Sequence, residues 1–162
     1  MDVGGGVGTI HHVLLEKGFT HATHFDASDA YLAVAAAEAE RLGHTSRVRF
    51  ESGDFASASS LPEVDVVTLH RVVCCDRNGP DLLRLAAGHA RQLVAFSYPR
   101  PRWITRVVIA GINATRRLMR DPFRVFLHEP SAMAATLERE GMRRAWSGGT
   151  FVWAMEIFER AA

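Results

Sequence analysis

Apolar and polar positions along this chain alternate between short apolar runs and longer stretches of helical periodicity, a pattern typical of a parallel sheet covered by helices. The apolar runs predict strands, in chain order, over residues 21–26, 47–51, 64–69 and 92–97. The periodic stretches predict helices over residues 9–17, 28–42, 78–89 and 129–140. Residues 142–146 and 150–158 then predict an antiparallel hairpin. We therefore expect a doubly wound, Rossmann-like α/β fold, with a mostly parallel sheet, helices on both faces and a C-terminal antiparallel hairpin.

One further helix, over residues 102–120, interrupts this alternation and is amphipathic along its whole length. Its apolar residues, such as Trp103 and Val107, share one face, and arginines fill the other. Residues 100–124 contain seven arginines and one acid, Asp121, which gives a local net charge of +6. We expect this inserted helix to act as a lid over the substrate cleft, and the alternative is a helix that lies on a membrane surface. Residues 1–162 are predicted to form one domain that contains this insertion.

Composition and charge narrow the range of functions. The chain has 19 basic and 18 acidic residues and a formal net charge of +1, which offers nucleic acid no general attraction. It has no uncharged apolar run of about 18 residues and no basic leader, which favours a cytoplasmic protein without stable membrane insertion. The two cysteines, Cys74 and Cys75, are adjacent and cannot frame a disulfide-rich fold. The histidines show no repeated ligand spacing, so we predict no metal site.

The chain opens on a glycine-rich turn, Asp2-Val3-Gly4-Gly5-Gly6-Val7-Gly8. Alternating glycines allow the backbone to take positive φ and to approach a ligand closely. Asp26 ends the second predicted strand, where a carboxylate can accept hydrogen bonds from both hydroxyls of a ribose. After the third strand, Asp54 can accept from the exocyclic amine of an adenine, and Phe55 offers an apolar surface for the ring.

These features together resemble the class I S-adenosylmethionine-dependent methyltransferases. The resemblance covers nearly the whole chain and rests on the spaced glycines of the first turn, Asp26, Gly53-Asp54-Phe55 and the closing hairpin. It implies that Asp2, Gly4 and Gly6 meet the methionine part of S-adenosyl-L-methionine, that Asp26 binds the ribose, and that Asp54 and Phe55 bind the adenine. It further implies that His70 and Arg71 border the methyl group. The full set of implied cofactor-binding residues is Asp2, Gly4, Gly6, Gly8, Asp26, Ala27, Asp54, Phe55, His70 and Arg71.

Each of these residues also has a purely structural interpretation. The glycines can serve only a tight turn, Asp26 can cap a helix, and Asp54 can be a turn residue stabilised by local hydrogen bonds. His70 can equally be a strand-end histidine without a catalytic task. The combination of features, rather than any one of them, favours cofactor binding.

Methyl transfer from a sulfonium is an in-line displacement, so the protein must align an electron-rich acceptor with the methyl carbon and exclude water. A general base is needed only where the acceptor arrives protonated. His70 is the first candidate for a catalytic base, followed by Tyr98 and His128. Arg71, Arg100 and Arg102 are candidates for holding a carboxylate or phosphate on a small-molecule acceptor.

The segment from Leu69 to Cys75, with Ser97-Tyr98-Pro99-Arg100 and the inserted helix, looks like bacterial small-molecule methyltransferases. It is also distantly similar to the magnesium protoporphyrin O-methyltransferase group, although no residue can be tied to a porphyrin. Only Met1 precedes Asp2, whereas the family normally has a longer central strand and further helices before this turn. We expect an N-terminally truncated form of a longer enzyme, or a homodimer or another partner that covers this region.

Two rival functions remain. A nicotinamide-dependent oxidoreductase would share the turn and Asp26, but its fingerprint requires a glycine where Thr9 stands and gives no reason for Gly53-Asp54-Phe55. A catalytically inactive domain of the same fold would bind only the cofactor or a protein partner.

Overall fold

The computed structural model describes residues 1–58 and 61–161 and confirms the predicted fold class. Seven strands form one sheet in the order β3-β2-β1-β4-β5-β7-β6. The strands are β1 (Asp2–Val3), β2 (Ala22–Asp26), β3 (Val48–Ser52), β4 (Val64–Leu69), β5 (Ala90–Pro99), β6 (Met142–Gly149) and β7 (Trp153–Arg160). The helices are α1 (Thr9–Glu16), α2 (Asp29–Arg41), α3 (Gly79–His89), α4 (Trp103–Leu118) and α5 (Pro130–Arg139), with short 3₁₀ turns η1 (Thr45–Arg47), η2 (Phe55–Ser57) and η3 (Val73–Cys75).

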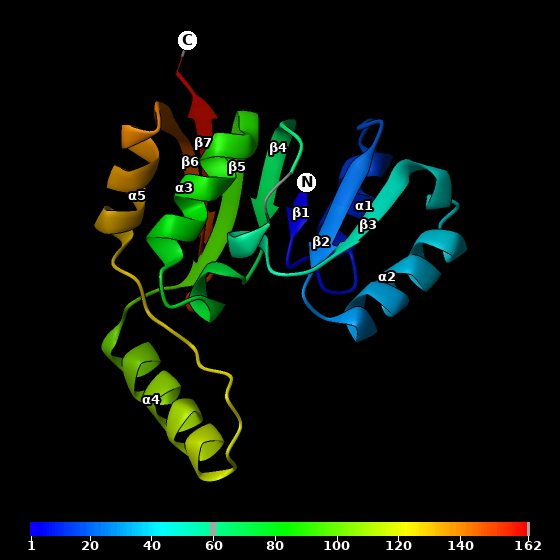
Figure 1. The fold of residues 1–162 in the computed structure, drawn as a ribbon. Helices are drawn as coiled ribbons and strands as arrows, with labels where there is room; N and C mark the ends of the chain where they lie inside the picture. The colour runs from blue at the N-terminus through cyan, green and yellow to red at the C-terminus, as the bar shows by residue number, and fades with distance from the viewer. Residues whose placement is uncertain (59–60, 162) are drawn as a thin grey trace.

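The helices cover the sheet in layers (Figure 1). In that view α3 and α5 lie in front of the sheet and pack against each other, while α1 lies behind it. Strands β1 to β5 pair in parallel, so each needs a crossover connection to the next. Apolar side chains of the sheet fill the core beneath α3 and α5, including Leu69, Phe96 and Phe158, all less than 4% exposed. This packing fixes the carboxyl ends of the parallel strands, where the predicted site lies.

The central strand, β1, is only two residues long. Asp2 and Val3 pair with His24 and Phe25 of β2, and Asp2 pairs with Thr68 of β4. Beside the amino-terminal halves of β2 and β4, where β1 does not reach, a cavity of about 270 Å³ opens. The glycine-rich turn is therefore anchored to the middle of the sheet by few ladder hydrogen bonds.

The predicted closing hairpin is confirmed. Strand β7 is antiparallel to β5 and lies between β5 and β6. Strand β6 extends further than the apolar pattern predicts, because its pairing with β7 continues through the glycines at 148 and 149. Strand β7 begins and ends later than predicted, at Trp153 and Arg160. The turn between the two strands lies at residues 150–152.

Ser28 caps α2 by accepting a hydrogen bond from the Tyr31 N–H.

The inserted helix forms as predicted, over Trp103–Leu118, but the structure does not place its apolar face on the sheet. Helix α4 projects from the carboxyl edge of the sheet, and residues 121–129 return alongside it (Figure 1). The side chain of Asn113 ties the two segments together, because it donates to the Val125 carbonyl and accepts from the Val125 N–H. Ile109 is buried, whereas Trp103 is 74% and Leu118 is 86% exposed. Among the described helices, none is long and apolar enough to cross a membrane.

Candidate functional site

The glycine-rich turn after β1 has the backbone conformation that its sequence predicts. Gly4, Gly6 and Gly8 have φ angles of +59°, +57° and +87°, a region that L side chains rarely adopt. A Cβ on Gly4 would lie 2.5 Å from Cγ2 of Val72, so this position needs glycine for packing as well. A Cβ on Gly6 would meet no described atom within 4 Å. The open space above Gly6 is where a ligand can approach the backbone.

Asp26 joins this turn to the end of β2. Its Oδ2 accepts a hydrogen bond from the Gly6 N–H at 3.0 Å, and its Oδ1 accepts one from the Ser28 N–H at 2.9 Å. These two bonds hold the buried carboxylate in one orientation. A carboxylate oxygen can accept two hydrogen bonds, so each oxygen retains one lone pair for a hydroxyl of a ligand.

Asp54 and Phe55 follow β3 and lie side by side at its carboxyl end. Asp54 caps the short turn η2, because its carboxylate accepts from the Ala56 N–H at 3.0 Å and from the Ser57 hydroxyl at 3.2 Å. The ring of Phe55 is buried and packs edge-on against Phe25, with centroids 6.0 Å apart. Asp54 caps this turn and also lines a cavity, together with Phe55.

That cavity, about 240 Å³ in volume, lies at the carboxyl ends of β1 and β2, where doubly wound folds bind their ligands. It brings together five of the predicted cofactor residues, namely Gly4, Asp26, Ala27, Asp54 and Phe55. Its wall also includes Val72, Cys75 and Asp76, which the sequence analysis missed. These three follow β4 in an irregular segment, and no motif marks them.

Asp2 is placed differently from its predicted role. Its Oδ1 accepts from the Thr68 hydroxyl at 2.7 Å, and its Oδ2 lies 3.1 Å from Nδ1 of His11, so the carboxylate is buried beneath the glycine-rich turn. Burial alone would raise the pKa of Asp2, but the hydrogen bonds from His11 and Thr68 outweigh it and lower the pKa below its usual value. Asp2 does not line the cavity that holds Asp26.

His70 and Arg71 stand at the carboxyl end of β4, outside the walls of that cavity. The Ser97 hydroxyl lies 3.0 Å from Nδ1 of His70 and accepts from the Arg71 N–H at 2.9 Å. Arg71 has a φ of +60°, an unusual value for a residue with a side chain, which is typical of functional sites. Partial burial and the charge of Arg71 lower the pKa of His70, so its imidazole is neutral at neutral pH.

Tyr98, the second candidate base, lies in β5 and faces a residue of the neighbouring strand β7. Its hydroxyl donates to Oε1 of Glu156 at 2.7 Å, and Arg144 donates to the other oxygen of the same carboxylate at 3.1 Å. Burial and this hydrogen bond to Glu156 raise the pKa of Tyr98, so the phenol keeps its proton. These contacts give Tyr98 a role in packing. They do not involve the residues of the cavity that holds Asp26.

His128, the third candidate, ties the segment after α4 to the turn η3. Its Nε2 lies 3.0 Å from the carbonyl oxygens of both Val73 and Asp76. Carbonyl oxygens only accept hydrogen bonds, so Nε2 carries the proton and donates it. This nitrogen is therefore not available to take a proton from a substrate.

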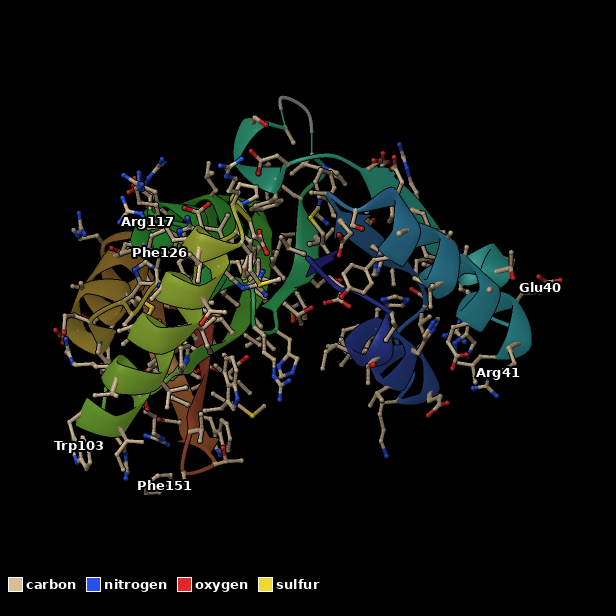
Figure 2. The ribbon with its side chains drawn as sticks, turned by 90° about the horizontal axis from the view of Figure 1, so that it is seen from below. Glu40, Arg41, Trp103, Arg117, Phe126 and Phe151 are labelled. Carbon is tan, nitrogen blue, oxygen red and sulfur yellow. The ribbon has the colours of Figure 1, made fainter. Side chains whose placement is uncertain are left out.

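The predicted acceptor-binding arginines gather around the turn between β6 and β7. Arg71 lies over the ring of Trp153 at 4.7 Å, and Arg102 lies over Phe151 at 4.4 Å. Arg100 donates to the carbonyls of Gly148 and Thr150, which fixes the turn. Figure 2 shows Phe151 and Trp103 toward the same end of the molecule, where α4 leaves the sheet.

Comparison with known proteins agrees with this arrangement. Residues 1–94, more than half of the chain, match the sequence model of a family described as a methyltransferase domain. A comparison with curated proteins finds no match.

Several solved structures have the same fold. The magnesium protoporphyrin IX methyltransferase of Synechocystis PCC 6803, with S-adenosylhomocysteine bound, aligns with a TM-score of 0.79 at 18% identity and covers 99% of this chain and 73% of that chain. An O-methyltransferase family 2 protein from Planctomyces limnophilus DSM 3776, in complex with apigenin, gives 0.77 at 18% identity and covers 99% and 50%. An S-adenosylmethionine-dependent methyltransferase from Mesorhizobium loti gives 0.76 at 14% identity and covers 98% and 89%.

Proposed function

Because this chain belongs to the class I S-adenosylmethionine-dependent methyltransferases, we propose that it transfers a methyl group to a small-molecule acceptor by in-line displacement. The observation that carries the proposal is the buried carboxylate of Asp26, fixed by Gly6 and Ser28 at the mouth of a cavity that Asp54 and Phe55 also line. The sulfonium of the cofactor supplies the electrophilic methyl group. The protein orients the two reactants and excludes water.

The residues of the cavity and of the adjoining glycine-rich turn suit the parts of S-adenosylmethionine. The free lone pairs of Asp26 suit the two ribose hydroxyls, and the open backbone at Gly6 allows close approach of the methionine part. Asp54 and the face of Phe55 suit an adenine. Asp2 acts on the cofactor indirectly in this proposal, because it supports the glycine-rich turn from below rather than touching the ligand.

His70 is the base that we propose for acceptors that arrive as a hydroxyl or another protonated group. Its side chain is exposed at the end of β4, its pKa is lowered by burial and by Arg71, and Ser97 fixes its ring. In this role Nε2 takes the proton while Nδ1–H donates to the Ser97 hydroxyl, which has a lone pair left beside its bond to the Arg71 N–H.

The acceptor side favours an anionic molecule. Arg71 and Arg102 both stack on aromatic rings, and a guanidinium so placed still presents N–H groups that suit a carboxylate. The apolar face of α4 starts beside this turn, and we propose that it closes over the acceptor as a lid.

The experiment that tests this function has two stages. Calorimetric titration with S-adenosylmethionine and, separately, with NAD is expected to show binding of the first alone. Transfer of a labelled methyl group to a panel of small acceptors, each tested with and without its carboxylate, is then expected to give turnover that depends on the carboxylate. Cofactor binding without transfer to any acceptor would instead support an inactive cofactor-binding domain.

A further inference from the structure

A cluster of buried polar side chains lies beneath the glycine-rich turn, outside the cofactor cavity. Asp2 comes from β1, His11 from α1 and His24 from β2, and each is no more than 2% exposed. Oδ2 of Asp2 lies 3.1 Å from Nδ1 of His11, which lies 3.2 Å from Nδ1 of His24. One potential ligand atom from each residue lies within 4.8 Å of the other two.

Hydrogen bonds alone do not satisfy these atoms. The carboxylate of Asp2 only accepts, so Nδ1 of His11 must donate its single hydrogen to it. Nδ1 of His24 then faces the same N–H group of His11. If Nδ1 of His24 carried a proton, the two hydrogens would point at each other. If it carried a lone pair, it would compete for the hydrogen that His11 already donates to Asp2. Unsatisfied buried polar atoms are costly and indicate a missing partner.

Gly5 leaves space at the centre of this cluster. A Cβ there would lie 2.6 Å from Oδ2 of Asp2 and 2.7 Å from Nδ1 of His24. The φ angle of Gly5 is not in the left-handed region, so its backbone does not require glycine. The side chains that converge on this position therefore account for the glycine better than the turn does.

From these contacts we infer that Asp2, His11 and His24 bind one divalent transition-metal ion, with zinc as the best-suited example. Zinc takes imidazole nitrogens at about 2.0–2.1 Å and carboxylate oxygens at similar distances, in tetrahedral geometry. Neighbouring ligands of such an ion are about 3.3 Å apart, close to the 3.1 Å and 3.2 Å observed here. A metal ion would accept one lone pair from each of the three atoms at once, so no hydrogen would be needed between them.

The surroundings of the three residues fit a metal site. The Thr68 hydroxyl donates to Oδ1 of Asp2 at 2.7 Å, which orients the carboxylate as outer hydrogen bonds do in metal sites. A cavity of about 270 Å³ beside β1 is lined by two of the three residues, Asp2 and His11, and by Thr68.

Such a site would stabilise the glycine-rich turn. The three ligands come from the strand before the glycine-rich turn, the helix after it and the neighbouring strand (Figure 1). An ion that joins them would hold the turn in the conformation that we propose for cofactor binding.

The test uses tag-free, chelator-treated full chain, titrated with Co²⁺ and Zn²⁺ in the absence of cofactor, so its outcome is independent of methyl transfer. We expect one equivalent of Co²⁺ to produce the visible absorption of a tetrahedral N/O site, Zn²⁺ to displace it, and the melting temperature to rise. Thr68→Val keeps all three ligands and is expected to weaken metal binding by about 10–100-fold. His24→Gln is expected to abolish the absorption, whereas His21→Gln, on an exposed histidine, leaves it unchanged.

Absence of the cobalt absorption in the folded wild-type chain would overturn the inference. The same holds if His24→Gln binds metal as tightly as the wild type. Should His24→Gln fail to fold, the wild-type spectrum and the Thr68→Val titration still decide the question.

Discussion

Oδ2 of Asp26 accepts a hydrogen bond from the backbone N–H of Gly6 at 3.0 Å, across 20 positions of sequence. This bond connects the two features that the sequence alone singles out, the glycine-rich turn and the acid at the tip of the second strand. It means that the turn and the carboxylate that we propose as the ribose ligand form one unit, whose geometry is set before a ligand arrives. Preorganisation of this kind reduces the entropy cost of binding.

Gly6→Ala tests whether the open space above the turn receives the cofactor. Gly43 is a matched control, because it also has positive φ, +70°, and a Cβ there would likewise meet no described atom within 4 Å. Both substitutions are expected to cost about 1–2 kcal/mol of stability through backbone strain. Only Gly6→Ala should also lose cofactor affinity, by at least tenfold in a calorimetric titration. Equal affinities for the two variants would contradict the assignment.

His70→Asn tests the proposed base. For an acceptor that must lose a proton, turnover is expected to fall by about 10²–10⁴-fold while cofactor affinity stays unchanged. Because partial burial and Arg71 lower the pKa of His70, wild-type turnover should fall only as the pH drops below the usual histidine value of about 6.5. This acidic limb should be missing in His70→Asn and present in His21→Asn. A turnover profile that His70→Asn leaves unaltered across pH would remove His70 from the mechanism.

Tyr98→Phe separates the structural role of this residue from the catalytic one that the sequence suggests. It removes the hydrogen bond to Glu156 and is expected to lower the free energy of unfolding by about 1–3 kcal/mol, without changing turnover per folded molecule. The phenol of the unfolded chain has a pKa of about 10, and folding raises it. The stabilisation by the protonated phenol is therefore complete below about pH 10 and is lost as the pH rises through the higher pKa of the folded state. Chemical denaturation at neutral and alkaline pH measures both effects. A loss of turnover with unchanged stability would restore Tyr98 as a catalytic residue.

The exposed face of α4 provides a test of the lid. Val107→Ser with Leu118→Ser is expected to change stability by no more than about 0.5 kcal/mol, because both side chains are exposed, and to raise the KM for the acceptor. Ile109→Ser, in the buried position of the same helix, should lower stability instead. Thermal unfolding and steady-state kinetics distinguish the two results. An unchanged KM in the double variant would show that this face does not meet the acceptor.

The sequence predicts the sheet well because its signals are local. Alternating apolar runs and the glycine turns each act within a few residues. The cofactor cavity is partly predictable for the same reason, since Asp26 and Asp54 each end or follow a strand.

What the sequence does not reveal depends on contacts between distant segments. Tyr98 and His128 have the residue types of catalytic bases, but their partners Glu156 and Val73 lie 58 and 55 positions away. The approach of Asp2, His11 and His24 arises only when β1, α1 and β2 assemble, so their spacing carries no ligand pattern. Amphipathicity likewise predicts that α4 forms, but not which surface its apolar face meets.

The most direct test of the central claim is a calorimetric titration of S-adenosylmethionine into the wild-type chain, Asp26→Asn and Asp65→Asn. In Asp26→Asn an amide N–H would oppose the N–H of Gly6 or Ser28 and the charged acceptor for the ribose would be lost, so affinity should fall at least tenfold. Asp65 is exposed at the start of β4, away from the cavity, and its variant should bind as the wild type does. Equal affinities for all three folded proteins, or no binding by the wild type, would contradict the account.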